Sequence, residues 1–283
     1  MSGMYRNRLG KLRLGIQLAS GIFFNGYLKG FGTGTIYNGR SKGACVPVLN
    51  CYSCPGALGA CPIGSLQAVL GQRRIPFYIL GSIMLFGIAL GRVVCGFLCP
   101  FGFLQDMFHK IPSFKIRVPD RLHKALCMVK YGILAIMVVA LPLAIAMGKG
   151  VAVPFFCKYV CPAGTASGVI LVALNPTLQK LMGVLFGWKF LVLIVVLLLA
   201  IAIPRPFCRY LCPLGAFYGL FHKISLFSMT LDETSCIQCG KCEQICPMQV
   251  DITKKIQSAE CIQCGACRNI CPTGAIKRSK RVP

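Results

Sequence analysis

A cysteine run that occurs twice near the end of the chain constrains its fold more than any other feature. The run has the form C-x2-C-x2-C-x3-C-P and starts at Cys236 and at Cys261. Thiolates with this spacing hold [4Fe–4S] clusters, in which three ligands come from one run and the fourth from the other. Structural zinc is the alternative, but zinc sites lack the paired arrangement. The predicted ligands are Cys236, Cys239, Cys242 and Cys271 for one cluster, and Cys261, Cys264, Cys267 and Cys246 for the second.

The rest of the sequence is apolar. Of the 283 residues, 55% are hydrophobic and only 13% are charged, which is unusual for a soluble protein. Long uncharged runs closed by Lys or Arg are typical of membrane spans. We predict four spans, at 14–28, 75–91, 131–148 and 190–204, and two re-entrant segments rich in Gly, Pro and Cys, at 43–72 and 159–179.

The charge is strongly positive, because 31 Lys and Arg stand against 7 Asp and Glu, a net +24. A nucleic-acid binder would gather these bases on one face with aromatic residues between them, whereas here they stand singly beside apolar runs. We therefore expect no nucleic-acid partner. The basic loop at 92–130 is placed in the cytoplasm by the positive-inside rule. Four spans then predict a multi-pass protein of the cytoplasmic (inner) membrane with both termini cytoplasmic.

A second cysteine pattern repeats within the membrane part. Each copy has an Arg, then C-x3-C-P, which we call a knot, and later a His-Lys-Ile triplet. The repeat predicts two halves, at about 43–130 and 150–227, that pack about a pseudo-twofold axis. The equivalent residues are Arg92, Cys95, Cys99 and His109 in the first copy, and Arg205, Cys208, Cys212 and His222 in the second.

Each knot supplies two thiolates, whereas a [4Fe–4S] cluster needs four, so two knots must cooperate. We predict a third cluster on the cytoplasmic side, held by Cys95, Cys99, Cys208 and Cys212. Arg92 and Arg205 are either countercharges for this cluster or interfacial anchors. His109 and His222 are either quinone contacts or polar residues that end an interfacial helix.

The same reasoning predicts a fourth cluster on the opposite side of the membrane. Cys61-Pro62-Ile63-Gly64 also resembles a knot, so the choice of ligands stays open. The expected ligands are Cys51, Cys54, Cys157 and Cys161, with Cys61 or Cys45 as alternatives.

Composition divides the chain after residue 227. Residues 228–283 contain five of the seven acidic residues and eight of the nineteen cysteines. The expected fold is an all-α polytopic membrane domain over 1–227, with about four spans and re-entrant helices, joined to a small α+β ferredoxin-like domain over 228–283.

The knots followed by the double cysteine run resemble the polytopic iron–sulfur proteins of the NapH and NosR type, and the last domain resembles bacterial two-cluster ferredoxins. This resemblance implies membrane electron transfer, and for the NapH type a flow from quinol towards a partner reductase. The chain departs from the NapH pattern in its extra cysteines and from the NosR pattern in lacking a large flavin-binding domain. These departures favour a conduit whose clusters reach both membrane faces. The extra cysteines are Cys51, Cys54, Cys61, Cys157 and Cys161.

The sequence therefore predicts an electron-transfer protein that relays single electrons through [4Fe–4S] clusters. Its partners would be a cytoplasmic redox protein and an acceptor in the membrane or on its outer face, within a membrane complex. Two alternatives stay open. One is a quinol/quinone oxidoreductase subunit of the NapH type, and the other is a metal-handling protein such as a copper reductase.

Overall fold

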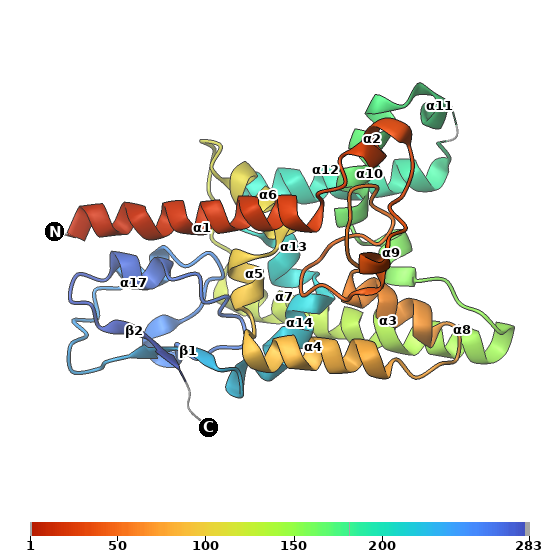
Figure 1. Ribbon diagram of the computed structural model, residues 1–283. Helices are drawn as coiled ribbons and strands as arrows, with labels where there is room; N and C mark the ends of the chain where they lie inside the picture. The colour runs from red at the N-terminus through yellow and green to blue at the C-terminus, as the bar shows by residue number, and fades with distance from the viewer. Residues whose placement is uncertain (1, 181, 281–283) are drawn as a thin grey trace.

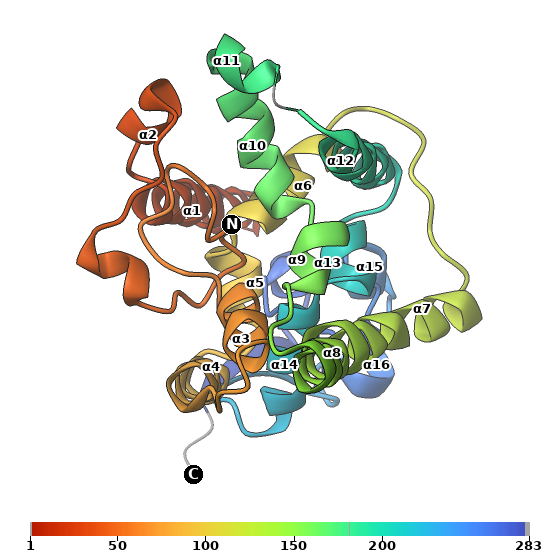
Figure 2. The ribbon, with the colours of Figure 1, turned by 90° about the vertical axis from the view of Figure 1, so that its right-hand side faces the viewer.

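The computed structural model describes residues 2–180 and 182–280, and most of them are helical (Figure 1). Figure 2 looks along the long helices and shows α1, α4, α8 and α12 almost end-on. The segment η2 is a π-helical stretch just ahead of Pro142, whose missing N–H interrupts the regular α-helical bonding. The long segments are α1 (Ser2–Phe24), α4 (Phe77–Ala89), the continuous rod of α7 (Asp120–Ile133), η2 (Leu134–Ala140) and α8 (Leu141–Lys149), and α12 (Val184–Ala202).

Two of these rods present apolar surface outward. Among the described residues, Asp120–Gly148 and Val184–Ala202 are long and apolar enough to cross a membrane, and only 17% of the apolar window of each is buried inside the protein. Exposing such surface to water would cost about 25 cal/mol per Å² of apolar area, whereas lipid covers it without that cost. The chain is therefore a membrane protein.

The count of four spans stays a prediction. The predicted spans 131–148 and 190–204 lie mainly in the two helices that are long enough. The predicted span 75–91 coincides with α4, a shorter apolar helix, and 14–28 begins within α1, which ends at Phe24. The start of α1 and the ferredoxin-like domain lie at the same end of the molecule (Figure 1).

Short helices and loops connect the long helices. Three of the short helices, α3, α6 and α14, begin with a proline directly after a cysteine N-cap. Proline suits this first helical position because its fixed φ is helical and its missing N–H would have no partner there. The short helices are α2 (Lys29–Thr33), η1 (Arg40–Gly43), α3 (Pro62–Leu70), α5 (Val93–Phe97), α6 (Pro100–His109), α9 (Phe155–Tyr159), α10 (Ala163–Leu174), α11 (Pro176–Gln179), α13 (Pro206–Tyr210), α14 (Pro213–Leu220) and η3 (Phe221–Lys223).

The C-terminal part is a small α+β unit. Strands β1 (Phe227–Leu231) and β2 (Ile276–Lys280) pair antiparallel, and Leu231 faces Ile276 in the register. Between them lie the one-turn helices α15 (Lys241–Gln244), α16 (Ile252–Lys255) and α17 (Ala266–Ile270). The core is made by Met229, Met248, Val250, Ile252, Ile262 and Ile276.

The two parts of the molecule share a boundary residue in their cores. Cys95 packs against both the larger hydrophobic core of the membrane part and the core of the ferredoxin-like unit. The two units are therefore joined through a predicted cluster ligand.

Candidate functional site

The ferredoxin-like unit contains two cavities, each lined by four cysteines. We call the thiols of the first cavity the distal set and those of the second the proximal set. The residues Gln238 and Gln263, at φ 51° in both cases, turn the backbone between two cysteines of each run. The distal set is Cys236, Cys239, Cys242 and Cys271, and the proximal set is Cys246, Cys261, Cys264 and Cys267. These are the two groups that the sequence assigns to the ferredoxin clusters.

A third cavity lies where the two knots meet. Cys95 comes from α5 and Cys208 from α13, while Cys99 and Cys212 directly precede α6 and α14. Apolar side chains such as Leu49 and Leu214 complete the wall. The structure thus gathers all four cysteines predicted for the third cluster. We call Cys95, Cys99, Cys208 and Cys212 the inner set.

The donors suit an iron–sulfur cluster better than a single metal ion. Four thiolates on one zinc would lie about 3.8 Å apart, since tetrahedral Zn–S bonds are about 2.3 Å long. Within the described residues, no three His, Cys, Asp or Glu side chains are close enough to share one ion. The thiols stand around the walls of cavities instead, as the corners of a cubane require.

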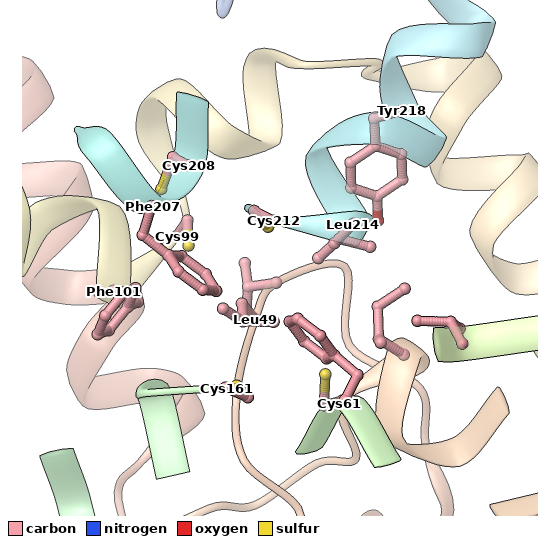
Figure 3. Close-up of a cluster of buried hydrophobic side chains, with 14 of the residues drawn as sticks. Leu49, Cys61, Cys99, Phe101, Cys161, Phe207, Cys208, Cys212, Leu214 and Tyr218 are labelled. Atoms are coloured by element: carbon pink, nitrogen blue, oxygen red, sulfur yellow. The ribbon is translucent and has the colours of Figure 1, made fainter. Parts of the chain in front are cut away.

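On the other side of Leu49 lies a second group of membrane thiols (Figure 3). A methyl group added at Gly164 would lie 2.7 Å from Cys51 Sγ, and one at Gly64 would lie 3.7 Å from Cys157 Sγ. Cys157 is within electrostatic range of three other thiols. We call these four the outer set: Cys51, Cys61, Cys157 and Cys161.

Two other predicted candidates for the fourth cluster have different surroundings. Cys54 Sγ donates to Asn25 Oδ1 at 3.7 Å. The backbone N–H of Cys45 donates to the Tyr78 hydroxyl at 3.4 Å. Cys45 also forms an isolated β-bridge with Ala60. Cys61 is within electrostatic range of Cys51 and Cys161, whereas Cys54 is in range of Cys51, so we expect the alternative ligand Cys61 to complete the outer set, and the choice of this ligand stays a prediction.

A different alignment of the sequence would have moved Cys61 from an alternative to an expected ligand. The motif C-P-x-G-x-L-Q occurs at 61–67 and at 99–105, and the motif F-C-x-Y-x-C-P occurs at 156–162 and at 207–213. Each membrane site combines one copy of each motif. Gln67 and Gln105, the last residues of the first motif, lie outside the cysteine–proline units compared in the sequence and were therefore overlooked.

The side chain of Arg205, the arginine of the second copy of the repeat, forms hydrogen bonds with the segment that carries the first knot. Its guanidinium is fully buried and holds Asp106 through two bonds, Nε to Oδ1 at 2.7 Å and Nη2 to Oδ2 at 2.5 Å. Its Nη1 donates to the Cys95 carbonyl at 2.6 Å. Arg13 of α1 donates to the same carboxylate. Burial alone would raise the pKa of Asp106, but Arg205 and Arg13 outweigh it and hold that pKa below its usual range.

Arg92, its counterpart, reaches the ferredoxin-like unit. Its Nη1 donates to the Ala259 carbonyl at 2.5 Å and to Glu260 Oε2 at 3.0 Å. Lys130 of α7 donates to the same carboxylate oxygen. Burial alone would raise the pKa of Glu260, but Arg92 and Lys130 outweigh it and lower that pKa. Glu260 directly precedes Cys261, so these bonds fix the proximal set against the membrane part.

The two predicted histidines lie away from the thiol cavities. His109 Nδ1 is 3.1 Å from the Ala200 carbonyl oxygen of α12, which suits a residue that ends a helix. His222 is buried. Neither histidine lines any of the three cavities described above.

The four thiol sets follow one another in space. Helix α17 carries Cys267 of the proximal set and is followed at once by Cys271 of the distal set. A Cβ added at Gly96 would lie 2.5 Å from the Ile262 carbonyl and 3.8 Å from the Cys264 Cα, so the proximal set lies against the segment that carries the inner set. Figure 3 shows Cys99, Cys208 and Cys212 of the inner set on the opposite side of Leu49 from Cys61 and Cys161 of the outer set. The order is distal, proximal, inner, outer.

The chain matches family models that are each described as a 4Fe-4S binding domain. One matches residues 75–119, 131–190 and 184–229, a second matches 254–277 and a third 229–250. Together with the thiol sets, these matches define an iron–sulfur protein. The chain belongs to the 4Fe-4S binding domain family, over both its membrane part and its ferredoxin-like unit.

Similar proteins agree with this assignment. The uncharacterized protein MJ0749 of Methanocaldococcus jannaschii is 32% identical over 206 residues, which cover 70% of this chain and 69% of MJ0749. The putative electron transport protein YccM of Escherichia coli is 29% identical over 221 residues, 72% of this chain and 57% of YccM. The ferredoxin-type protein NapH of Haemophilus influenzae is 27% identical over 185 residues, 63% of this chain and 57% of NapH. The resemblance to the NapH and NosR type is confirmed. No solved structure matches the chain.

Proposed function

We propose that this chain is an integral membrane protein that relays single electrons between a cytoplasmic redox protein and an acceptor in the membrane or on its outer face. Each of the four thiol sets would hold one [4Fe–4S] cluster. The bound clusters supply the one-electron chemistry, while the protein holds them, spaces them and excludes water. The name of the relative YccM, a putative electron transport protein, agrees with this proposal.

The observation that carries the proposal is the serial order of the thiol sets. Cys95 belongs to the inner set and also packs against the core around the proximal set. Phe207 precedes Cys208 of the inner set, Phe156 precedes Cys157 of the outer set, and the centroids of the two rings are 6.5 Å apart. Apolar packing between neighbouring sites favours electron transfer from site to site, because tunnelling falls steeply with distance and buried apolar walls limit reorganisation.

The exposure of the distal set supports an entry point for the cytoplasmic partner. Cys239 is the exposed cysteine of this set, whereas the inner set is mostly buried. The start of α1 and the ferredoxin-like unit lie at one end of the molecule, which supports a cytoplasmic location for both (Figure 1). The outer set would then deliver electrons at the opposite side.

The two arginines of the knots fit the role of countercharges. Arg205 is within electrostatic range of Cys208 and Cys264, and Arg92 is within range of Cys95. Both lie between the inner and proximal sets, where bound clusters would concentrate negative charge. Their full burial favours this role over interfacial anchoring, since an anchoring side chain extends towards water.

Iron and sulfide analysis of anaerobically purified protein, combined with an EPR redox titration, tests the proposal. We expect about sixteen iron atoms per chain, because four cubanes hold four each. The titration should resolve four centres. About eight iron atoms would leave only the ferredoxin pair, and the proposed relay would be wrong.

A further inference from the structure

Gln105 contacts a cysteine of the inner set through its side-chain amide. The residue lies in α6 and is fully buried. Its Nε2 donates to Cys208 Sγ at 3.1 Å and to the Phe101 carbonyl at 3.3 Å. Its Oε1 accepts the backbone N–H of Phe207 at 3.1 Å. Because a donor fixes Oε1, the NH₂ group is the end that faces the sulfur.

Gln67 makes the same bonds at the outer set. It lies in α3 and is also fully buried. Its Nε2 donates to Cys157 Sγ at 3.3 Å and to the Ile63 carbonyl at 3.2 Å. Its Oε1 accepts the backbone N–H of Phe156 at 3.0 Å. In both sites the glutamine therefore reaches the first cysteine of an F-C-x-Y-x-C-P segment and the amide just before it.

Packing alone does not require this arrangement. An apolar side chain could fill the same space, whereas a buried amide must find partners for all its polar atoms or lose stability. Two sites built from segments far apart in the chain use the same residue, the same atoms and the same sulfur position. The shared feature is the N–H donated to sulfur.

We propose that Gln105 and Gln67 raise the reduction potentials of the inner and outer clusters by donating a hydrogen bond to one ligating sulfur in each. The inference rests on the function proposed above. A reduced cluster carries one more negative charge than the oxidised form, so a donor at its thiolate stabilises the reduced form more. Gln105 and Gln67 are positioning residues, since the bond that each accepts from the backbone N–H just before the cysteine also orients that cysteine.

The test is an EPR redox titration of the complete protein with its clusters. Gln105→Met keeps the length of the side chain and removes the donor, and Gln105→Leu also removes the donor but has a shorter, branched side chain. We expect the ratio of reduced to oxidised inner centre at the wild-type midpoint to fall about tenfold, which is 59 mV for a one-electron couple. The outer centre should keep its potential. Gln67→Met is the matched control and should shift only the outer centre.

The other possible outcomes of this titration separate the inference about the glutamines from the proposed function. An inner centre that is present with an unchanged potential in Gln105→Met would overturn the inference and leave the four-cluster assignment standing. A shift of both centres by one variant, or loss of the inner cluster in both Gln105 variants, would also overturn it, since the glutamine would then act on structure. A wild-type protein without inner and outer centres would instead refute the proposed function.

Discussion

Replacing Glu260 with glutamine should loosen the ferredoxin-like unit from the membrane part. Glu260 is the carboxylate that Arg92 and Lys130 share across this boundary. The side chains of these cations are 1% and 0% exposed, and that of Glu260 is 16% exposed. Glu260→Gln keeps the shape of the side chain and leaves both cations without a counterion.

The size of the effect follows from this burial. Removing one partner of a buried ion pair costs about 3–5 kcal/mol, because the other charge stays desolvated. Arg92 keeps its bond to the Ala259 carbonyl and Lys130 keeps one to the Arg209 carbonyl, so the lower limit applies. About 3 kcal/mol corresponds to roughly a hundredfold change in the equilibrium between docked and undocked units.

Hydrogen exchange of the backbone amides at the boundary measures this equilibrium. Peptides that contain Gly96 and Ile262 should exchange roughly a hundredfold faster in Glu260→Gln, because exchange there requires local opening. Glu233→Gln, at an exposed position of the same unit, is the control and should leave exchange unchanged. Adding Lys130→Met to Glu260→Gln should restore part of the protection, since it removes one unpaired buried charge. Unchanged exchange in Glu260→Gln would refute the reasoning.

Three further predictions concern the ligands and the topology. Cys61→Ser should remove the outer EPR centre while Cys54→Ser leaves it in place, and the reverse result would restore Cys54 as the ligand. Cys99→Ser and Cys212→Ser should each remove the same inner centre, and the double variant should remove nothing more, because all four thiolates belong to one coordination set. Two different centres lost separately would contradict the shared set. Reporters on both termini should map to the cytoplasm and a reporter within 30–40 to the outer face, whereas termini on opposite sides would mean an odd number of spans.

Local spacing made part of the site predictable from sequence. The runs that start at Cys236 and Cys261 fix their own loops, so the cysteines around the distal and proximal cavities could be assigned without a structure. The inner set could be inferred because the knots around Cys95 and Cys208 are so similar. In both cases the information lies within a few neighbouring residues.

Contacts between distant segments could not be predicted in the same way. Cys61 lies near Cys157 because α3 reaches α9, where Gln67 bonds to Phe156 and Cys157, and the spacing of Cys51 and Cys54 does not encode this contact. The bond of Gln105 to Cys208 and that of Glu260 to Lys130 connect residues far apart in the chain. Such bonds depend on how the helices pack, which no short pattern encodes.

The claim that the four sites act in series is tested most directly by following one electron through the protein. A photoreductant that reduces the exposed distal centre starts the reaction, and freeze-quench EPR then follows each centre in wild type and in Cys212→Ser. We expect the outer centre to become reduced in wild type, whereas in Cys212→Ser electrons reach the distal and proximal centres and stop there. Reduction of the outer centre at the wild-type rate without an inner centre would contradict transfer in series.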